Sequence, residues 1–290
     1  MTTVAVLPAG SVSDEAAKLF FSDESVQWKY HRMISDVFLS TVNNISNYSV
    51  IPIENTIDGS VSLHLDWLVH EVDLPIQAEW VYPSIQNLIG RRSELLNESG
   101  QFDYSKVKKV ISHPVAMSQC LQYIREYFPY AETEHVSSTA ESVKIAADHP
   151  GEGIVAIGTK TAAVNNKLDI LAESITDHNN NYTRFFLVGD KPYTARENSN
   201  MKTSILVTLP EDYAGALHQV LSAFAWRRIN LSRIESRPTK KKLGSYYFYI
   251  EIKYSLEEFL LQSALQEIEA IGCQVRVLGC YPSYKYEQLL

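Results

Sequence analysis

The stretch VIPIENTIDGSVSLHLDWL, residues 50–68, carries the pattern that decides the fold. Its apolar start, residues 50–53, has the length and composition of a buried strand. After a polar turn, Val61, Leu65 and Leu68 recur at helical spacing. A buried strand, a turn and a helix in succession form the repeating element of α/β proteins.

The same pattern recurs outward from this stretch. Apolar runs at residues 4–7, 107–111 and 154–157 also predict buried strands. Leu121, Ile124 and Phe128 also recur at helical spacing, and Pro114 suits the first turn of this helix, which we expect to end near Tyr127. Up to about residue 188 the alternation predicts an α/β architecture with largely parallel sheets. In such sheets ligands collect where strands end and helices begin.

A different pattern follows a polar stretch at residues 190–202, which we interpret as a linker. The order of the predicted elements is strand, helix, strand, strand, helix, strand, at residues 203–209, 215–226, 229–236, 243–252, 256–271 and 273–278. This βαββαβ order predicts a ferredoxin-like second domain of about 80 residues. A domain of this size often covers its sheet edge with a partner copy.

Composition narrows the function classes. With 290 residues, 45% hydrophobic and 21% charged, the chain is long enough for two globular domains. A net charge of −8 and the lack of a long basic block, Lys240-Lys241-Lys242 being only a turn cluster, argue against a nucleic-acid partner. The N-terminal apolar run is too short for a signal peptide or a membrane span. Three separated cysteines fit free thiols in a reducing cytoplasm, and the eight histidines lack metal-ligand spacing.

Three predicted strand-to-helix junctions carry hydroxyl and amide groups. The first holds Asn55, Thr56 and Ser60, the second Ser112, His113 and Gln119, and the third is Ser137-Ser138-Thr139-Ala140-Glu141, which resembles a capping box. Each segment alone fits simple helix capping, with His113 as a satisfied turn residue. Each also fits anion binding at a helix N-terminus, and both interpretations stay open.

A fourth polar segment, DHNNNYTRF at residues 177–185, runs into a predicted buried strand. Arg184 offers a planar fork for a carboxylate, and Thr183 offers one proton donor. The alternative is an Asn-rich turn with a surface arginine. The glycines at residues 151–158 do not fit the dinucleotide motif, and there is no phosphate loop or serine-nucleophile motif. Repeated hydroxyl and amide groups at the junctions favour a small-molecule site.

Together these segments resemble the prephenate dehydratase family over nearly the whole chain. The resemblance rests on Pro52-Ile53-Glu54-Asn55 with Gly59 and Val61, on Ser112-His113-Pro114 with Gln119-Cys120, on Ser138-Thr139-Ala140, and on Asp177, Asn181 and Thr183-Arg184-Phe185. Near the C-terminus, Gly215-Ala216-Leu217 and Glu235-Ser236-Arg237-Pro238 look like the ACT regulatory module of that family.

The resemblance implies an α/β, two-lobed catalytic domain like the periplasmic binding proteins, followed by a ferredoxin-like ACT domain. The catalytic domain would span residues 1–190, with lobe 1 at about 1–78 and 172–190 and lobe 2 at about 79–171. The ACT domain would span residues 201–281. The site would lie in the cleft, where Asn55 and Thr183 would face Ser112, Gln119 and Thr139.

The resemblance also implies the activity: a cytoplasmic lyase that converts prephenate to phenylpyruvate, carbon dioxide and water in phenylalanine biosynthesis, without cofactor or metal. Thr183 would be the essential hydroxyl. The implied catalytic residues are Thr183, Arg184 and Phe185, and the implied substrate-binding residues are Glu54, Asn55, Thr56, Ser112, Gln119, Thr139 and Asn181. L-Phenylalanine would inhibit a homodimer or homotetramer through Gly215, Ala216, Leu217, Glu235, Ser236, Arg237 and Pro238.

The chain departs from the family at a few positions. Residues 7–13 read Leu-Pro-Ala-Gly-Ser-Val-Ser where the family usually has Gly-Pro-x-Gly-Thr-Phe-Ser, Thr56 replaces a common serine, and Ser142 replaces a usual alanine. Because the hydroxyls at Ser11, Ser13 and Thr56 are retained, we expect activity to remain.

Three alternatives share these motifs. An arogenate dehydratase would differ only in accepting an amino group on the substrate side chain. A non-catalytic sensor of aromatic amino acids, or a decarboxylase that does not aromatise its product, would have no need of Thr183. Because the motifs begin at residue 7, we expect a monofunctional chain without a preceding chorismate mutase region.

Overall fold

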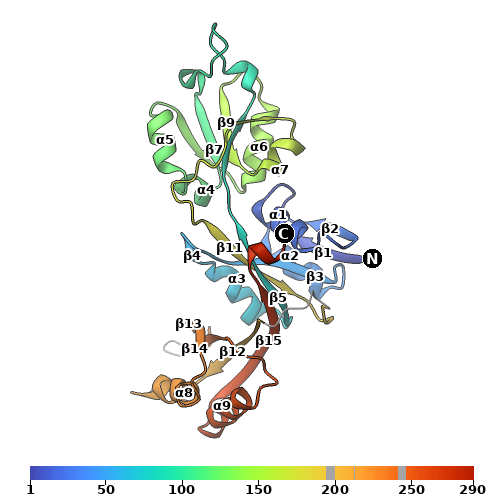
Figure 1. Ribbon diagram of the computed structural model, residues 1–290, viewed down its shortest axis with the longest axis vertical. Coiled ribbons are helices and arrows are strands. Elements are labelled where there is room, and N and C mark those ends of the chain that lie inside the picture. Colours follow the sequence, from blue (N-terminus) through green and yellow to red (C-terminus); the bar gives the residue numbers. More distant parts are fainter. Residues whose placement is uncertain (194–199, 212, 241–245) are drawn as a thin grey trace. The chain divides into compact units, whose positions relative to one another are not determined.

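The structure is a computed structural model that describes residues 1–193, 200–211, 213–240 and 246–290 (Figure 1). The chain is a mixed α/β protein and divides into two compact units, each built from segments distant in sequence. Unit 1 comprises Met1–Val72, Trp80–Phe185 and Lys285–Leu290, and unit 2 comprises Asp73–Glu79 and Phe186–Tyr284. The chain passes between the units along strands β5 (Ile76–Pro83) and β11 (Tyr182–Val188) and near Tyr284.

The first sheet of unit 1 has a parallel part, as the sequence predicts. Strand β1 (Thr2–Val6) pairs in parallel with β2 (Val26–Tyr30) on one side and with β3 (Tyr48–Asn55) on the other, although the short strand β4 (Gly59–Ser60) pairs antiparallel with β3. Helix α1 (Val12–Phe20) begins where the Ser11 hydroxyl accepts the Asp14 N–H, and α2 (Ile34–Val42) precedes β3. The predicted strands at residues 4–7 and 50–53 therefore exist: the first starts earlier and ends at Val6, before Leu7, and the second is extended at both ends.

The helix predicted around Leu65 and Leu68 is also present. Strand β3 first turns back through the short strand β4 (Gly59–Ser60). Helix α3 (Ser62–Asp66) then buries Leu65 and passes into a π-helical turn at Trp67–Glu71, which buries Leu68. Both apolar positions therefore face the core, as their spacing predicts.

The second sheet of unit 1 is mixed, so the prediction of largely parallel sheets is only partly right. Its strand order is β10-β6-β9-β7-β8, in which β7 runs parallel to β8 and β9 while β6 runs antiparallel to β9 and β10. The strands are β6 (Asn87–Gly90), β7 (Lys109–Ser112), β8 (Glu132–His135), β9 (Ile154–Gly158) and β10 (Asp169–Ala172).

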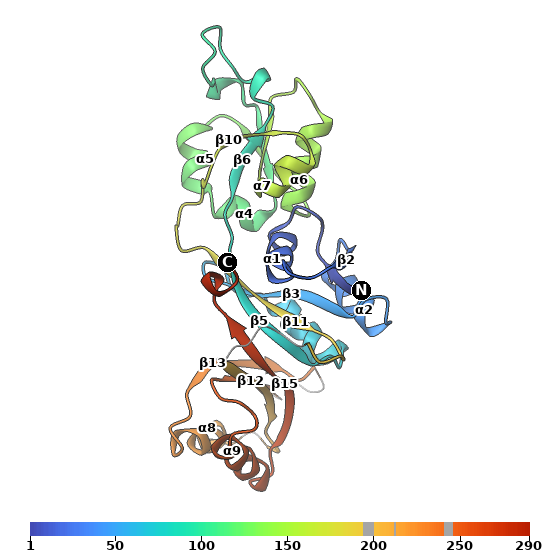
Figure 2. The same ribbon diagram turned by 45° about the vertical axis from the view of Figure 1, so that its right-hand side comes forward.

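Helices cover both faces of this sheet (Figure 2). On one face Val110 and Val155 pack with residues of α4 (Pro114–Ser118) and α5 (Leu121–Tyr127). On the other face Ile111 and Ala156 pack with residues of α6 (Thr139–Asp148) and α7 (Lys160–Asn165). Residues 107–111 and 154–157 thus contribute side chains to both cores, which explains why these runs are wholly apolar apart from the lysines at 108 and 109.

The prediction of one helix from Pro114 to about Tyr127 is wrong. Pro114 does open a helix, but α4 ends at Ser118 and α5 starts at Leu121. The break at Cys120, with φ −121° and ψ 20°, leaves a new helix start. There the Asp177 carboxylate accepts the N–H groups of Gln122 and Tyr123. A distant side chain thus caps the second helix, which local periodicity does not predict.

Gly10 marks a close approach within unit 1. Its φ is +81°, and a Cβ atom there would lie 3.0 Å from the Cα of Ala162 at the start of α7. The Thr159 hydroxyl donates to the Gly10 carbonyl at 2.7 Å, while the Gly10 N–H donates to the Asp14 carboxylate at 2.8 Å. The loop before α1 therefore fits against α7 because position 10 has no side chain.

Unit 2 has the predicted βαββαβ order. Its sheet has the strand order β13-β14-β12-β15 with every neighbouring pair antiparallel, and Ile205, Val207, Ile250 and Ile252 pack beneath α8 and α9. The elements are β12 (Met201–Thr208), α8 (Ala216–Ala225), β13 (Leu231–Pro238), β14 (Tyr246–Ile252), α9 (Phe259–Ala270) and β15 (Gln274–Tyr284).

Parts of three predictions lie outside the described residues. These are most of the linker (194–199), the last two lysines of the predicted turn cluster (241–242), and the start of the third predicted strand (243–245).

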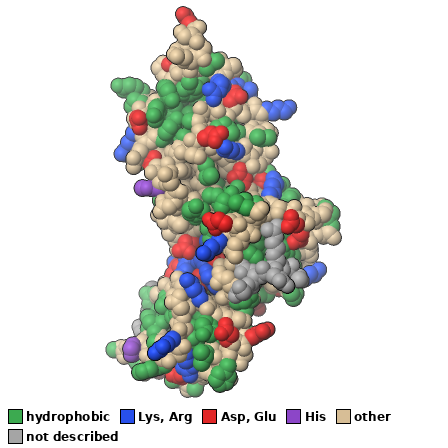
Figure 3. Space-filling view, viewed as in Figure 1, with side chains coloured by type: hydrophobic (Ala, Val, Ile, Leu, Met, Phe, Trp, Pro, Cys, Tyr) green, Lys and Arg blue, Asp and Glu red, His purple; other side chains and the backbone are tan. Residues whose placement is uncertain are grey.

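The sheet face of unit 2 that lies away from its helices buries charged groups. The carboxylate of Glu79, 1% exposed, contacts the Lys202 ammonium at 2.5 Å and accepts the Ser283 hydroxyl at 2.7 Å. The hydroxyl of Ser204 lies 2.6 Å from that of Tyr281. On the molecular face drawn in Figure 3, acidic and basic side chains are interspersed. No helix of the described residues is long and apolar enough to cross a membrane.

Candidate active site

Asn55, at the end of β3, holds the start of β11 through its side chain. Its Nδ2 donates to the Asn181 Oδ1 at 2.8 Å and to the Thr183 Oγ1 at 3.0 Å. Its Oδ1 accepts the backbone N–H groups of Ile57 and Asp58 at 2.9 and 3.1 Å. An asparagine readily makes such a turn after a strand. These contacts fix both ends of the amide, so its N–H faces the Thr183 hydroxyl.

Asn181 and Gln119 extend this network. Asn181 Nδ2 donates to the Gln119 Oε1 at 2.8 Å, and Gln119 Nε2 donates to the Asp58 carboxylate at 2.6 Å. All three amides are at least nine-tenths buried: Asn55, Gln119 and Asn181. Buried amides that satisfy one another form a rigid, polar surface. We call Asn55, Asp58, Gln119, Asn181 and Thr183 the amide cluster.

Thr183 is half-buried and lies at the edge of the amide cluster. Besides Asn55, its hydroxyl contacts the Ser84 hydroxyl, with the two oxygens 2.6 Å apart. Ser84 belongs to none of the motifs predicted from the sequence. Its one sequence signal is its place directly after a strand end, at Pro83.

Arg184 is paired within the chain. Its guanidinium lies 2.8 Å from the carboxylate of Glu54, and its side chain is 11% exposed, compared with 41% for Glu54. Glu54, which precedes Asn55 in the sequence, therefore forms an ion pair with Arg184. Thr56 has a different role, because its hydroxyl donates to the Asn180 carbonyl and accepts the Tyr182 N–H. That double contact anchors the loop before β11.

Three predicted site residues have other surroundings. Phe185 is fully buried and stacks on Trp80 with ring centroids 5.7 Å apart. Ser112 is fully buried and donates to the Ile157 carbonyl at 2.8 Å. Thr139 opens α6, and its carbonyl accepts the Ser142 hydroxyl. Among the described residues, none of these three side chains has a hydrogen bond to the amide cluster.

Burial disfavours the charged forms of two titratable groups at the second junction. Burial, together with the neighbouring His135, lowers the pKa of His113 below its ordinary value. The His113 ring accepts the Val115 N–H, so it caps α4. Burial raises the pKa of the Cys120 thiol, and Asp177 adds to that effect. Since the thiolate is the reactive form, Cys120 is an inert core residue.

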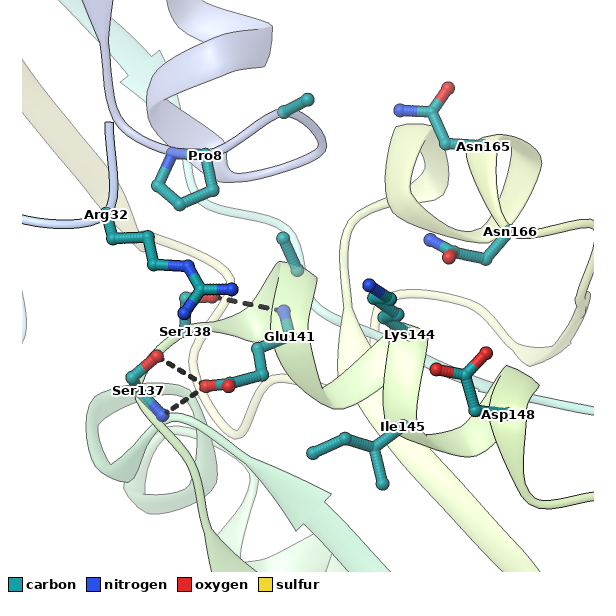
Figure 4. Close-up of a pocket in the computed structure, with 12 residues that line it drawn as sticks. Pro8, Arg32, Ser137, Ser138, Glu141, Lys144, Ile145, Asp148, Asn165 and Asn166 are labelled. Carbon is teal, nitrogen blue, oxygen red and sulfur yellow. Dashed lines mark hydrogen bonds between the residues drawn. The ribbon is translucent and has the colours of Figure 1, made fainter. Parts of the chain in front are cut away.

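The third junction lines a pocket of about 490 Å³ (Figure 4). Ser138 caps α6 by accepting the Glu141 N–H, and the Glu141 carboxylate accepts the Ser137 N–H. Hydrogen bonds from the Ser137 hydroxyl and from its N–H to this carboxylate lower the pKa of Glu141. In a capping box this carboxylate would accept the N–H of the N-cap residue, Ser138. Here it accepts the N–H of Ser137, one residue earlier. Arg32 and Lys144 also line the pocket, but no residue of the amide cluster does.

The predicted effector residues lie in unit 2. Gly215 has φ +94° and is the N-cap of α8, with Ala216 buried and Leu217 half-buried behind it. On β13, residues alternate between the two sheet faces, so Glu235 and Arg237 share one face while Ser236 and Pro238 are exposed on the other. Glu235 lies 2.6 Å from Arg233 and 3.7 Å from Arg237.

No group of three or more His, Cys, Asp or Glu side chains suited to a metal ion occurs within the described parts of the chain.

Comparison with known proteins identifies the family. The sequence pattern of the family described as prephenate dehydratase matches residues 4–193. The chain is 37% identical to the prephenate dehydratase of Bacillus subtilis and 41% identical to that of Methanocaldococcus jannaschii, covering 96% of this chain and 97% of each relative. A crystal structure of prephenate dehydratase in complex with L-Phe, from Arthrobacter aurescens, superposes with a TM-score of 0.84. It is 29% identical and covers 97% of this chain and 90% of that chain. The chain belongs to the prephenate dehydratase family of lyases.

Proposed function

We propose that this chain converts prephenate to phenylpyruvate, carbon dioxide and water, with Thr183 as the group that assists loss of the ring hydroxyl. The observation that carries the proposal is the contact between the buried Asn55 amide and the Thr183 hydroxyl, which fixes a proton donor at the edge of a rigid polar cluster. Family membership supplies the reaction class, and this contact supplies a group with the chemistry the reaction needs.

The reaction needs little covalent help from the protein. The bond between the ring carbon and its carboxylate breaks, and that electron pair moves into the ring as the opposite carbon–oxygen bond breaks. The departing hydroxyl gains one proton and leaves as water, while the carboxylate leaves as carbon dioxide. Aromatisation provides the driving force, so the protein must mainly position a dianion and help hydroxide leave.

The residues divide these tasks. Thr183 donates a hydrogen bond or its proton to the departing hydroxyl, a contribution of about 10²–10⁴-fold for a positioned donor. Arg184, held by Glu54, offers a substrate carboxylate a guanidinium fork. Phe185, the third residue of this set, is buried in the core and anchors this part of β11 by stacking on Trp80. The substrate-binding set is Glu54, Asn55, Thr56, Ser112, Gln119, Thr139 and Asn181, of which Asn55 and Gln119 present the fixed amides.

An ultraviolet assay of phenylpyruvate tests the proposed function. Purified protein is expected to form phenylpyruvate from prephenate without added metal or cofactor. A parallel reaction with arogenate, in which the formation of phenylalanine is measured, tests the alternative function. An arogenate dehydratase would turn over arogenate faster than prephenate. Absence of turnover with both substrates would reject the lyase function and favour a non-catalytic sensor.

We further propose that residues 201–281 form an ACT regulatory domain and residues 1–190 the catalytic domain, with lobes at about 1–78 plus 172–190 and at about 79–171. The βαββαβ order of unit 2 supports this assignment, as does the L-Phe complex of the Arthrobacter relative. The effector carboxylate would meet N–H groups in the first turn of α8, after Gly215. Glu235, Ser236, Arg237 and Pro238 would enclose the remainder of the effector.

L-Phenylalanine is expected to inhibit turnover of prephenate. The expected coupling between effector and substrate sites is about 1–3 kcal/mol, or roughly 5–150-fold in apparent affinity. The measurement is initial rate against prephenate concentration, with and without L-phenylalanine, and glycine serves as an effector control without a side chain. Equal rates under both conditions in the assembled enzyme would contradict regulation by L-phenylalanine.

The proposed effector site lies at an interface between copies of unit 2, in a homodimer or homotetramer. Light scattering of the purified protein, with and without L-phenylalanine, measures that assembly. A monomer at the concentrations used for inhibition would contradict the interface.

A further inference from the structure

Ser84 is a buried serine placed against the Thr183 hydroxyl. It follows the end of β5, is 4% exposed, and its Oγ lies 2.6 Å from the Thr183 Oγ1. Its backbone is fixed on both sides by Asn181: the Ser84 N–H donates to the Asn181 carbonyl at 2.8 Å, and the Ser84 carbonyl accepts from the Asn181 Nδ2 at 3.0 Å. The position of Ser84 relative to the amide cluster is therefore fixed by its two backbone hydrogen bonds to Asn181.

The number of hydrogen-bond partners sets the direction of this contact. Each hydroxyl has one proton, and either oxygen could be the donor. Across the described residues, Thr183 is the only hydrogen-bond partner of the Ser84 hydroxyl. If Thr183 donated to Ser84, the buried Ser84 proton would have no acceptor, which costs free energy. If Ser84 donates, its proton is satisfied.

The same direction leaves Thr183 ready to donate. Its oxygen then accepts two hydrogen bonds, one from the Asn55 Nδ2 at 3.0 Å and one from Ser84 at 2.6 Å. Its own proton is then left for a further partner, because both contacts fall on the oxygen, and the residue is half-buried. Two donors on the oxygen also stabilise the negative charge that grows there as the proton leaves.

We propose that Ser84 is a positioning residue, which orients the Thr183 hydroxyl so that its proton is presented to the substrate. This inference rests on the proposed dehydratase function and adds a residue to it. Ser84 does not contact the reacting atoms and acts through Thr183.

Kinetics of four proteins test the inference: wild type, Ser84→Ala, Thr183→Ala and the double variant. Ser84→Ala is expected to lower kcat about tenfold, as for loss of one hydrogen bond in the transition state, with KM within about twofold. In the Thr183→Ala background, Ser84→Ala is expected to change kcat less than about twofold, because no hydroxyl remains to be oriented. Ser84→Thr, which restores the donor, is expected to recover most of the loss.

Several outcomes would overturn the inference. They are a kcat for Ser84→Ala within about twofold of wild type, an equal loss in both Thr183 backgrounds, or no recovery with Ser84→Thr. Thermal unfolding of each variant verifies the fold. Should Ser84→Ala not fold, Ser84→Cys, a weak donor of similar shape, is expected to show the same loss of kcat. A wild-type protein inactive on prephenate would overturn the proposed function itself, a result distinct from those above.

Discussion

Thr183→Ala is expected to lower kcat for phenylpyruvate formation by about 10²–10⁴-fold, the usual contribution of a positioned proton donor. The variant removes the hydroxyl that Asn55 and Ser84 hold at the edge of the amide cluster. KM is expected to change much less than kcat, because the lost contact strengthens as the carbon–oxygen bond breaks.

The fold is expected to survive this substitution. The Asn55 Nδ2 keeps two acceptors, the Asn181 Oδ1 and the Tyr182 carbonyl. Thr183→Ser, which keeps the hydroxyl, is the matched control and is expected to retain far more turnover than Thr183→Ala. The measurement is steady-state kinetics alongside the thermal unfolding midpoint. Wild-type turnover by a folded Thr183→Ala protein would exclude the role given to this hydroxyl.

Glu79→Ala is expected to destabilise unit 2 by about 3–5 kcal/mol, the range for removing one partner of a buried ion pair. The Lys202 side chain is 12% exposed, so its ammonium would lose its 2.5 Å partner without gaining full hydration. The Ser283 hydroxyl would lose its acceptor as well. The midpoint of unfolding in urea, compared between the variant and the wild type, measures the loss of stability.

Two controls separate the buried charge from other effects. Asp73 pairs with Arg276 at 2.8 Å in the same unit, but its side chain is 96% exposed, so Asp73→Ala is expected to change stability by less than about 1 kcal/mol. The double variant Glu79→Met with Lys202→Met removes both charges together and is expected to be at least as stable as Glu79→Ala. Equal midpoints for Glu79→Ala and Asp73→Ala would show that burial adds nothing to this pair.

Local sequence patterns predict much of this fold. The strands and helices around residues 50–68 arise from side-chain periodicity, which is a property of neighbouring residues. The βαββαβ order of unit 2 follows for the same reason. The break between α4 and α5 could not be predicted in this way, because Asp177, which caps α5, lies more than 50 residues further along the chain.

The amide cluster was only partly predictable. Asn55, Gln119 and Asn181 were expected near Thr183, and hydrogen bonds do join them. Ser84 could not be found, because a serine after a strand has no periodic or motif signal and its contact spans 99 residues. Phe185 was expected in the site as part of a three-residue motif. Its side chain is fully buried and stacks on Trp80 of β5, a contact that no local pattern around residues 183–185 indicates.

Gly10 limits how the chain can vary in sequence. Its backbone lies in the left-handed region, and the space beside it is occupied by the backbone of Ala162. Even alanine would push that backbone by a few tenths of an ångström, and larger residues would push it further. One absent methyl group thus sets the smallest spacing between the loop before α1 and the start of α7. Substitutions at residue 10 are therefore expected to be tolerated less well than at its exposed neighbour Ala9.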